Sequence, residues 1–342
     1  MASHRLIVER PESHLTITGF LRFRLSLTWS QAKDLVQQKR VRIGSQPAVD
    51  VAARLRTGQT VDVLDFAPSA PSKSSRPAKP KPKPAQKISP RDRYSGPLPE
   101  LIYLDDSILV VNKPIGLTTM RHPEEAAEFG SRGKRFLPPT LADLLPELFS
   151  IPPRSIYAVH RIDRDTTGVV VFARNQRAEK HLTVQFRNHS ILRRYLALTR
   201  GQPKSGRVES ILVADRGDGR RGSSTTSGDG QTAVTHVKIL ETLGEFSLVQ
   251  CRLETGRTHQ VRIHLGEMRT PLCGETVYDR PLHGAPYPDT SGAERPMLHA
   301  AMLGLQHPDM EEWMQWECPL PEEMRSLLIE LRTRAKKDSD PE

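Results

Sequence analysis

Cysteine is scarce in this chain. Only three occur in 342 residues, Cys251, Cys273 and Cys318. They are odd in number, widely spaced and never arranged as C-x-x-C, which argues against a disulfide framework and a structural zinc site. We therefore expect three small core residues in a protein of a reducing compartment.

Long hydrophobic runs are also missing. No stretch approaches the roughly 18 consecutive apolar residues of a membrane-spanning helix. The first residues, MASHRLIVERPESH, lack the apolar centre of a secretion signal. No Rossmann or P-loop glycine pattern occurs, so nothing points to a nucleotide cofactor. These absences predict a soluble, cytoplasmic protein without a membrane association.

Acidic residues are outnumbered, and the imbalance is local. The chain carries 50 Lys and Arg against 40 Asp and Glu, a net charge of +10. Residues 1–66 hold 10 basic and 6 acidic side chains, residues 67–90 hold 6 and none, and the remainder holds 34 of each. Such clustering is typical of proteins that bind a polyanion, most often nucleic acid, although basic tails without a specific partner also occur.

A proline-rich segment divides the chain. Seven prolines lie between Pro68 and Pro90, with lysines spaced among them. Such a segment cannot bury a core and favours an extended, partly polyproline conformation. We predict a flexible linker over residues 67–97, between an N-terminal domain (1–66) and a larger domain (98–330) that is followed by a polar tail (331–342).

The first 66 residues have the pattern of a small α/β domain. Residues 20–25 and 30–36 predict two short helices, the second capped by Ser30, and residues 41–43 and 61–64 alternate like strands. This order resembles the alpha-L RNA-binding fold, although the Ser-Arg pair that usually opens its second helix is absent. The resemblance implies that six basic residues contact RNA: Arg22, Arg24, Lys33, Lys39, Arg40 and Arg42. The alternative is a small basic domain that binds protein.

The larger domain combines many strands with few helices. Helical periodicity is confined to residues 175–188 and a short segment after Thr258. Strand-like runs recur at residues 101–103, 108–111, 169–172, 195–199, 235–240 and 246–253. Without regular βαβ alternation, this pattern favours an α+β fold with a mainly antiparallel sheet. The glycine-rich stretch 215–230 is expected to be a mobile loop, which either orders on substrate or has no role.

The most informative stretch is VHRIDRDTTG, residues 159–168, which runs into an apolar strand. Taken alone, Asp163 between two arginines is typical of a loop ion pair. Metal binding by His160, Asp163 and Asp165 is a second interpretation, but the flanking arginines would repel a cation and no other ligand cluster accompanies them. We therefore expect no metal.

Spaced motifs give this stretch a more specific meaning. HRIDRDTTG resembles the signature of the RluA family of pseudouridine synthases, His-Arg-Leu-Asp followed by Thr-Ser/Thr-Gly and an apolar strand. The family's other motifs stand in order: Asn-Lys-Pro at 112–114, Arg-Tyr-Leu-Ala at 194–197, TGRTHQVRIHL at 255–265 and Met-Leu-His-Ala at 297–300. The resemblance covers roughly residues 98–330. Departures are small, such as Glu275 where an Asp often follows Gly274.

The resemblance implies isomerisation of uridine to pseudouridine in RNA without a cofactor. The N1 glycosidic bond breaks, the uracil rotates, and C5 joins the same sugar carbon, so nothing is oxidised or hydrolysed. Asp163 would be the essential carboxylate, either attacking C1′ or removing the C2′ proton. Because burial raises the pKa of a carboxylate, a fixed cation should lie beside it. The family assigns this place to Arg262, with Arg257 and Arg164 as weaker candidates.

Two further roles follow from the resemblance. Tyr195 is expected to stack on the target uracil and to assist proton removal from C5. Arg161 is expected to fill the gap left when the target nucleotide flips out of the RNA helix. Without the resemblance, Tyr195 is an ordinary core residue and Arg262 a surface arginine on a short helix. His259 and His264 are interpreted as capping or packing residues.

The resemblance favours large-subunit ribosomal RNA as the substrate, with transfer RNA as the alternative. Two other classes of function stay open: a catalytically silent RNA-binding or ribosome-assembly factor on the same scaffold, and a glycosidase, which would need a second carboxylate such as Asp165. We expect a monomer whose partner is RNA and which uses no small-molecule cofactor.

Overall fold

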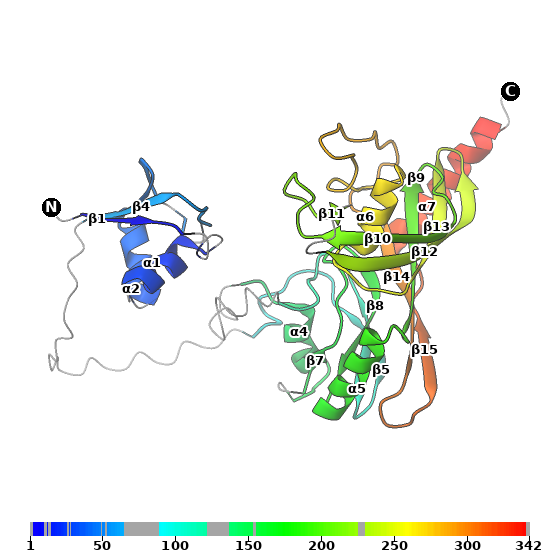
Figure 1. Cartoon of the computed structure of the whole chain (residues 1–342). Helices are drawn as coiled ribbons and strands as arrows, with labels where there is room; N and C mark the ends of the chain where they lie inside the picture. Colours follow the sequence, from blue (N-terminus) through cyan, green and yellow to red (C-terminus); the bar gives the residue numbers. More distant parts are fainter. Residues whose placement is uncertain are drawn as a thin grey trace. The chain divides into compact units, whose positions relative to one another are not determined.

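The structure is a computed structural model that describes residues 3–9, 12, 15–25, 27, 29–48, 50–51, 53–64, 89–121, 137–152, 155–224 and 230–339. The chain forms two compact units, residues 1–86 and 87–342 (Figure 1). Most of the predicted linker, residues 67–88, lies outside the described residues, as do residues 122–136 and the side chain of Ser30.

The N-terminal unit packs two helices on a small antiparallel sheet. Its strands run in the order β1-β4-β2-β3. The elements are β1 (Ser3–Ile7), α1 (Ile17–Leu25), α2 (Trp29–Gln37), β2 (Val41–Ile43), β3 (Gln46–Pro47) and β4 (Thr60–Leu64). Both predicted helices and both predicted strands are confirmed, while β1 and β3 were not foreseen. Gly44 has a φ of 62° in the turn between β2 and β3, a conformation that glycine adopts without strain.

The core of this unit follows from the helical pattern. Phe20 and Leu21 of α1 are fully buried, and on α2 the predicted apolar face of Ala32, Leu35 and Val36 is buried. These side chains pack against strand residues such as Val41 in one apolar cluster. Burying a large apolar side chain contributes roughly 1.5–3 kcal/mol, so the small sheet alone would not hold this unit together.

The C-terminal unit is built on one large mixed sheet. The strand order is β11-β10-β12-β13-β9-β14-β8-β6-β5, with β7 paired to β8 and β15 paired to β14. The strands are β5 (Glu100–Leu104), β6 (Ile108–Lys113), β7 (Tyr157–Ala158), β8 (Thr167–Ala173), β9 (Leu192–Arg200), β10 (Gly206–Val213), β11 (Gly222–Ser223), β12 (Gln231–Leu243), β13 (Phe246–Leu253), β14 (Leu298–Gln306) and β15 (Trp313–Glu317). Among the described strands of this sheet, only β8 and β14 pair in parallel. The α+β prediction is confirmed.

Four described helices accompany the sheet: α4 (Leu141–Leu148), α5 (Gln176–Arg187), α6 (Gln260–Glu267) and α7 (Glu322–Ser339). The first helix was missed because it contains Pro146, yet Thr140 and Asp143 begin it with a capping box. For α5, the side chain of Asn175 accepts from the backbone amide of Ala178 at 2.8 Å. This helix lies against β7 and β8, and α6 lies against β12.

Two predicted domain boundaries differ from the structure. Helix α7 continues past residue 330, and Leu331 is fully buried. Residues 331–339 of the expected polar tail are therefore part of this helix, whose apolar face still packs on the sheet. At the other end, the backbone amide of Arg91 donates to Glu147 at 3.3 Å, and Arg93 donates to the carbonyl of Leu137. Residues 89–97 of the predicted linker therefore belong to the C-terminal unit.

Other expectations about the chain can be compared with the described residues. All three cysteines are buried and free, as predicted. Part of the expected loop 215–230 forms β11, which pairs with β10, and residues 225–229 lie outside the described residues. None of the described helices has the length and apolar composition needed to cross a membrane.

Candidate active site

A basic cleft lies where the loop before β8 meets β9, the end of α5 and the start of α6. Its volume is about 390 Å³. The titratable side chains that line it are His160, Arg161, Asp163, Arg187, His189, Arg193, Tyr195, Arg257, His259 and Arg262. Within the described part of the chain, Asp163 is the one carboxylate of this lining. The cleft therefore suits an anionic ligand.

The structure brings Asp163, Tyr195 and Arg262 to this one cleft. Nη1 of Arg262 lies 3.5 Å from Oδ2 of Asp163, and the Asp163 side chain is 18% exposed. Tyr195 lies on β9 and is 9% exposed. These residues are separated by 32 and 67 positions in sequence, so their meeting depends on the fold.

The backbone around Asp163 is fixed from both sides. The hydroxyl of Thr119 donates to the carbonyl of Ile162 at 2.7 Å and accepts from its amide at 3.2 Å. The buried ammonium of Lys113 donates to three carbonyls, those of Pro114, Leu117 and Arg164, at 2.8 to 2.9 Å. All three ammonium donors are thereby used, one of them on the residue that follows Asp163.

Glu275 orients Arg262 toward the aspartate. Its carboxylate accepts from Nε and Nη2 of Arg262 at 2.7 and 2.8 Å, which is a bidentate pair. Burial alone would raise the pKa of Glu275, but the hydrogen bonds and charge of Arg262 hold it below its usual value. Burial likewise opposes the charge on Arg262, and the hydrogen bonds and charge of Glu275, with Asp163, raise its pKa. Both groups stay charged at neutral pH, leaving Nη1 for Asp163.

His259 is a neighbour of Asp163 that the sequence interpretation missed. Its Nε2 lies 3.8 Å from Oδ1 of Asp163, and its Nδ1 hydrogen bonds with the hydroxyl of Tyr278 at 2.7 Å. The residue has a left-handed φ of 59° at the start of α6, and its side chain makes no capping hydrogen bond. Burial lowers its pKa, so the imidazole is neutral at pH 7. His264, by contrast, is buried and bonded to Thr235, as a packing residue should be.

Tyr195 presents a neutral phenol to the cleft. Burial raises the pKa of Tyr195 to about 12, with Arg193 acting in the opposite direction and Asp163 in the same direction. In β9 the side chains of residues 193, 195 and 197 are buried, while those of 192, 194 and 196 are half-buried. The alternation of a strand thus places Arg193 and Tyr195 on one face.

The remaining predicted residues of the larger domain divide into two groups. Arg161 and Arg257 line the cleft, and Nε of Arg257 donates to the carbonyl of Thr232 at 3.1 Å. Arg164 does not line the cleft: its side chain is 66% exposed and pairs with Asp165 at 3.1 Å. In the structure Arg164 is therefore not the cation beside Asp163, because its side chain pairs with Asp165 and is not part of the cleft lining. Asp165 is likewise outside the lining.

The six basic residues of the N-terminal unit differ in availability. Lys33, Lys39 and Arg42 are exposed, as is Arg22. Arg24 instead pairs with Glu9 at 2.7 Å and Glu12 at 2.5 Å, and Nε of Arg40 donates to the carbonyl of Leu64 at 3.2 Å. Lys33, Lys39 and Arg42 are therefore better placed to meet a polyanion than Arg24, whose charge is balanced within the unit.

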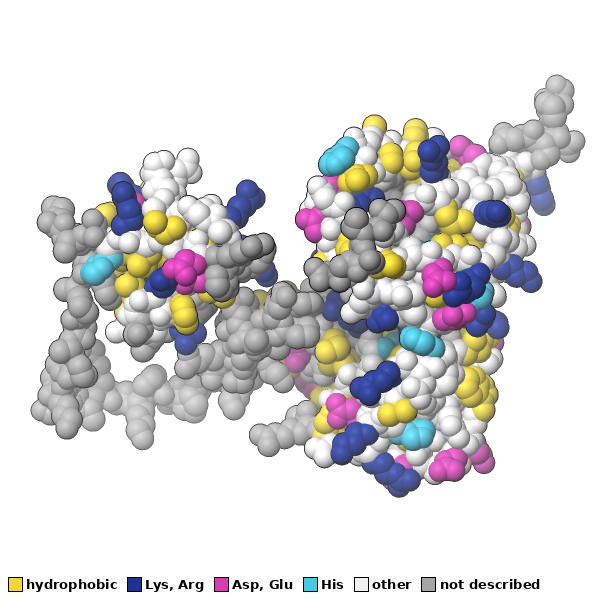
Figure 2. Space-filling model, in the orientation of Figure 1, with side chains coloured by type: hydrophobic (Ala, Val, Ile, Leu, Met, Phe, Trp, Pro, Cys, Tyr) yellow, Lys and Arg dark blue, Asp and Glu magenta, His cyan; other side chains and the backbone are white. Residues whose placement is uncertain are grey.

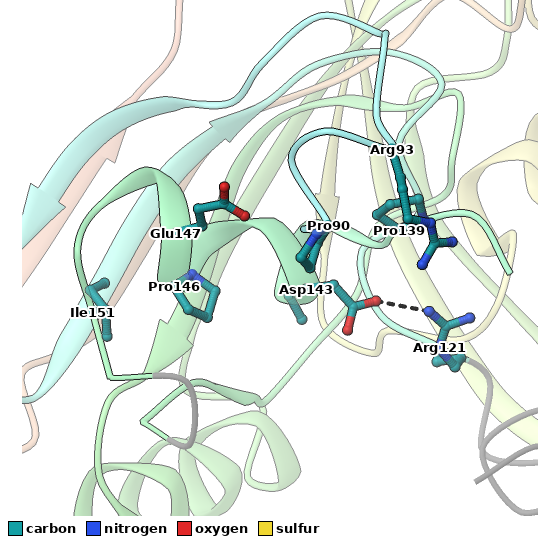
Figure 3. Close-up of a pocket in the computed structure, with 9 residues that line it drawn as sticks. Pro90, Arg93, Arg121, Pro139, Asp143, Pro146, Glu147 and Ile151 are labelled. Atoms are coloured by element: carbon teal, nitrogen blue, oxygen red, sulfur yellow. Dashed lines mark hydrogen bonds and ion pairs between the residues drawn. The ribbon is translucent and has the colours of Figure 1, made fainter. Parts of the chain in front are cut away.

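A second cavity, of about 310 Å³, lies beside α4 (Figure 3). Its Asp143 pairs with Arg121 at 2.8 Å, with both side chains 13% exposed, and also accepts from Thr140. The lining contains Arg93 and Glu147 but none of the predicted site residues. Because its buried carboxylate is already paired and its arginines stand beside two acids, this cavity does not match an anionic substrate.

Comparison with known proteins defines the class of this fold and site. The family model described as RNA pseudouridylate synthase matches residues 107–267. The solved structure of human RNA pseudouridylate synthase domain containing 4 superposes with a TM-score of 0.54 at 24% identity, covering 68% of this chain and 93% of that one. At this identity, the likeness shows the fold alone.

Relatives with similar sequences define the family of this protein more closely than the fold does. The chain is 34% identical over 262 residues to the uncharacterised RNA pseudouridine synthase YlyB of Bacillus subtilis, covering 72% of this chain and 82% of the relative. It is 38% identical over 247 residues to ribosomal large subunit pseudouridine synthase D of Neisseria meningitidis serogroup A, covering 70% of this chain. The chain spans 63% of that relative's length. This protein belongs to the RluA family of RNA pseudouridine synthases.

Proposed function

We propose that this protein isomerises uridine to pseudouridine in large-subunit ribosomal RNA. Its family membership supports the reaction, and the name of the Neisseria relative supports the substrate. The single observation that carries the proposal is Asp163, held 3.5 Å from Arg262 in a cleft whose other charged lining residues are basic. Transfer RNA is the alternative substrate.

The charge distribution of the cleft fits an RNA strand. The residues Arg161, Arg187, Arg193 and Arg257 line it without a carboxylate within salt-bridge distance among the described residues. Phosphates of the RNA would supply the missing negative charge. The exposed cations of the N-terminal unit and the basic residues 67–90 would add a second, less specific grip.

The geometry supports a division of roles around a flipped uridine. Asp163, with Nη1 of Arg262 3.5 Å from its carboxylate, attacks C1′ or removes the C2′ proton. Tyr195 stacks on the released uracil, and its neutral hydroxyl assists at C5. Arg161, exposed at the rim, fills the space that the flipped nucleotide leaves. His259, neutral and 3.8 Å from Asp163, limits how the carboxylate can turn.

Mapping of pseudouridine in cells tests the proposal. RNA from cells with the wild-type protein, with Asp163→Asn, and with none is treated to form pseudouridine adducts and read by primer extension. We expect one or a few uridines of large-subunit ribosomal RNA to be modified only with the wild-type protein. Modification that persists with Asp163→Asn would contradict the role of Asp163. An identical map in all three would favour an RNA-binding or ribosome-assembly factor on this scaffold.

A further inference from the structure

Arg193 is a buried cation in the cleft that has no individual role in the reaction proposed above. It is 7% exposed and shares a face of β9 with Tyr195. Its Nη2 donates to the carbonyl of Glu254 at 2.5 Å, and its guanidinium carbon lies 5.7 Å from the ring centre of Phe186. These contacts hold the side chain in place at the wall of the cleft but provide no negative charge.

The charge of Arg193 is uncompensated within the described residues. No carboxylate forms a salt bridge with it, and its Nε is buried without a hydrogen-bond partner. Burial lowers the pKa of Arg193, and the neighbouring charge of Arg257 lowers it further. A buried guanidinium without a counter-ion is costly, so its place in the cleft is explained if an anion binds there.

Gly256 gives Arg193 its position. A Cβ atom on this residue would lie 2.3 Å from Nη1 of Arg193, so the guanidinium occupies the space that a side chain would need. Arg257 follows directly and also lines the cleft. Gly256 thus lets Arg193, on β9, and Arg257, in the loop after β13, approach the same part of the cleft wall although their charges repel each other.

We propose that Arg193 and Arg257 form a phosphate subsite of the cleft, which binds a phosphodiester of the RNA next to the uridine that Tyr195 faces. The inference rests on the proposed function, because it takes RNA as the ligand. A guanidinium pair suits a phosphate, which can accept several hydrogen bonds in one plane. The subsite would fix the sugar-phosphate backbone while the base rotates, so Arg193 is a positioning residue.

The test measures binding separately from catalysis. The probe is an unmodified transcript of the organism's large-subunit ribosomal RNA, tritiated at uracil C5, and affinity is followed by filter binding between low and moderate salt. For Arg193→Gln we expect affinity to fall about tenfold, as for one charged hydrogen bond, and the slope of log affinity against log salt to decrease by about 1. Arg193→Lys should keep the slope and recover part of the affinity.

Two further variants separate a phosphate contact from a structural effect. Gly256→Ala should displace the end of Arg193 without unfolding the protein and lower affinity by a smaller factor. Arg252→Gln is the matched control, because Arg252 is exposed on β13 and pairs with Arg194, on the other face of the sheet. We expect its binding to match the wild type.

The stability of Arg193→Gln completes the test. Since the substitution removes an unpaired buried charge, its Tm should not fall below that of the wild type. An unchanged salt slope in a folded Arg193→Gln protein, or a large fall in Tm with unchanged affinity of the folded fraction, would overturn the phosphate subsite. Absence of tritium release by the wild-type protein would instead contradict the proposed function, whatever the binding data show.

Discussion

At the scale of single residues, the charge state of each group in the site depends on its neighbours and its burial. Arg262 and Glu275 keep each other charged, whereas burial keeps Tyr195 and His259 neutral. Arg262 is shared between Glu275 and Asp163, and the shorter contacts are to Glu275. Glu275 therefore has more influence on the site than its place outside the signature motif indicates. Tyr195 and His259 are neutral beside these charges because both are desolvated.

The phenol of Tyr195 should resist ionisation. With its pKa raised to about 12 by burial, Tyr195 stays protonated where an ordinary tyrosine, with a pKa near 10, titrates. We expect the ultraviolet difference spectrum between wild type and Tyr195→Phe to contain no phenolate signal at a pH of about 10.5. Ionisation of Tyr195 near pH 10 would show that water reaches its hydroxyl more easily than the buried position in the structure implies.

Removal of the Glu275 charge should destabilise the protein in a pH-dependent way. Glu275→Gln leaves Arg262 largely buried with a weakened partner, so we expect a loss of about 3 kcal/mol in the free energy of unfolding at pH 7. The folded pKa of Glu275 is depressed, so the unfolded state binds more protons as the pH falls. The contribution of the Glu275 carboxylate to the free energy of unfolding is thus present above pH ~4.3. It is lost as the pH falls through the pKa that Glu275 has in the folded protein.

Urea unfolding between pH 3 and pH 7 measures this difference, with Glu317→Ala as a control on the exposed face of β15. The gap between wild type and Glu275→Gln should narrow as the pH falls. A gap of constant size would show that the carboxylate charge does not stabilise Arg262.

At the scale of elements, the loop of residues 159–166, which carries Asp163, is held by β6 and β8. Lys113 at the end of β6 binds the backbone of the loop, and β8, which follows the loop, pairs with β14 in parallel through Gly168 and Ala300. Gly168 has a φ of 114°, and a Cβ atom there would lie 2.2 Å from the carbonyl oxygen of Ala300. The close approach of β8 and β14 therefore requires glycine.

Gly168→Ala should lower the free energy of unfolding by about 3 kcal/mol or more, since the strain of a left-handed alanine and a backbone clash add together. Gly292→Ala is the matched control, because Gly292 has a φ of 79° but no atom within 4 Å of the added Cβ. It should cost about 1 kcal/mol. If thermal or urea unfolding shows the same loss of stability for Gly168→Ala and Gly292→Ala, then β14 moves aside to accommodate the added methyl group.

The elements also show what a sequence can predict. Helix α5 and eight strands, β2, β4, β5, β6, β8, β9, β12 and β13, were predicted because their apolar residues alternate or repeat at helical spacing. Helix α4 was not, because Pro146 conceals its periodicity. The tail beyond residue 330 looked polar because α7 has one narrow buried face, which includes Leu331. The composition of a segment does not predict a helix well when only a few of its side chains are buried against the rest of the protein.

For the site, motif resemblance identified the residues and the proximity of Arg262 to Asp163, but not the contact of Arg262 with Glu275. Asp163, Tyr195 and Arg262 line one cleft, as expected. The direction of Arg164 could not be derived, because residues adjacent in a loop point in different directions. The contact of Arg262 with Glu275 depends on how α6 meets a separate loop, which local patterns do not specify.

At the scale of the whole molecule, we expect the two units to have separate tasks. The apolar clusters of the larger unit contain no residue from 1–86. The excess positive charge, however, lies within residues 1–90, and on the face seen in Figure 2 the Lys and Arg side chains of the larger unit stand among Asp and Glu. Chemistry and general RNA affinity should therefore be separable.

A fragment of residues 87–342 should fold and retain catalysis. We expect it to release tritium from RNA labelled at uracil C5, but to bind RNA more weakly and with a smaller dependence on salt, because fewer cations release counter-ions from the phosphates. Filter binding of fragment and full chain at several salt concentrations measures both quantities. Equal salt slopes would contradict a role for the basic N-terminal residues in RNA binding.

We propose that Asp163 performs the isomerisation in the cleft. Tritium release by the purified full chain from a ribosomal RNA transcript labelled at uracil C5 tests this role when wild type, Asp163→Asn and the surface control Asp309→Asn are compared. We predict release with the wild type and the control, and none with Asp163→Asn, although all three bind the transcript. Release by Asp163→Asn at the wild-type rate would contradict the claim.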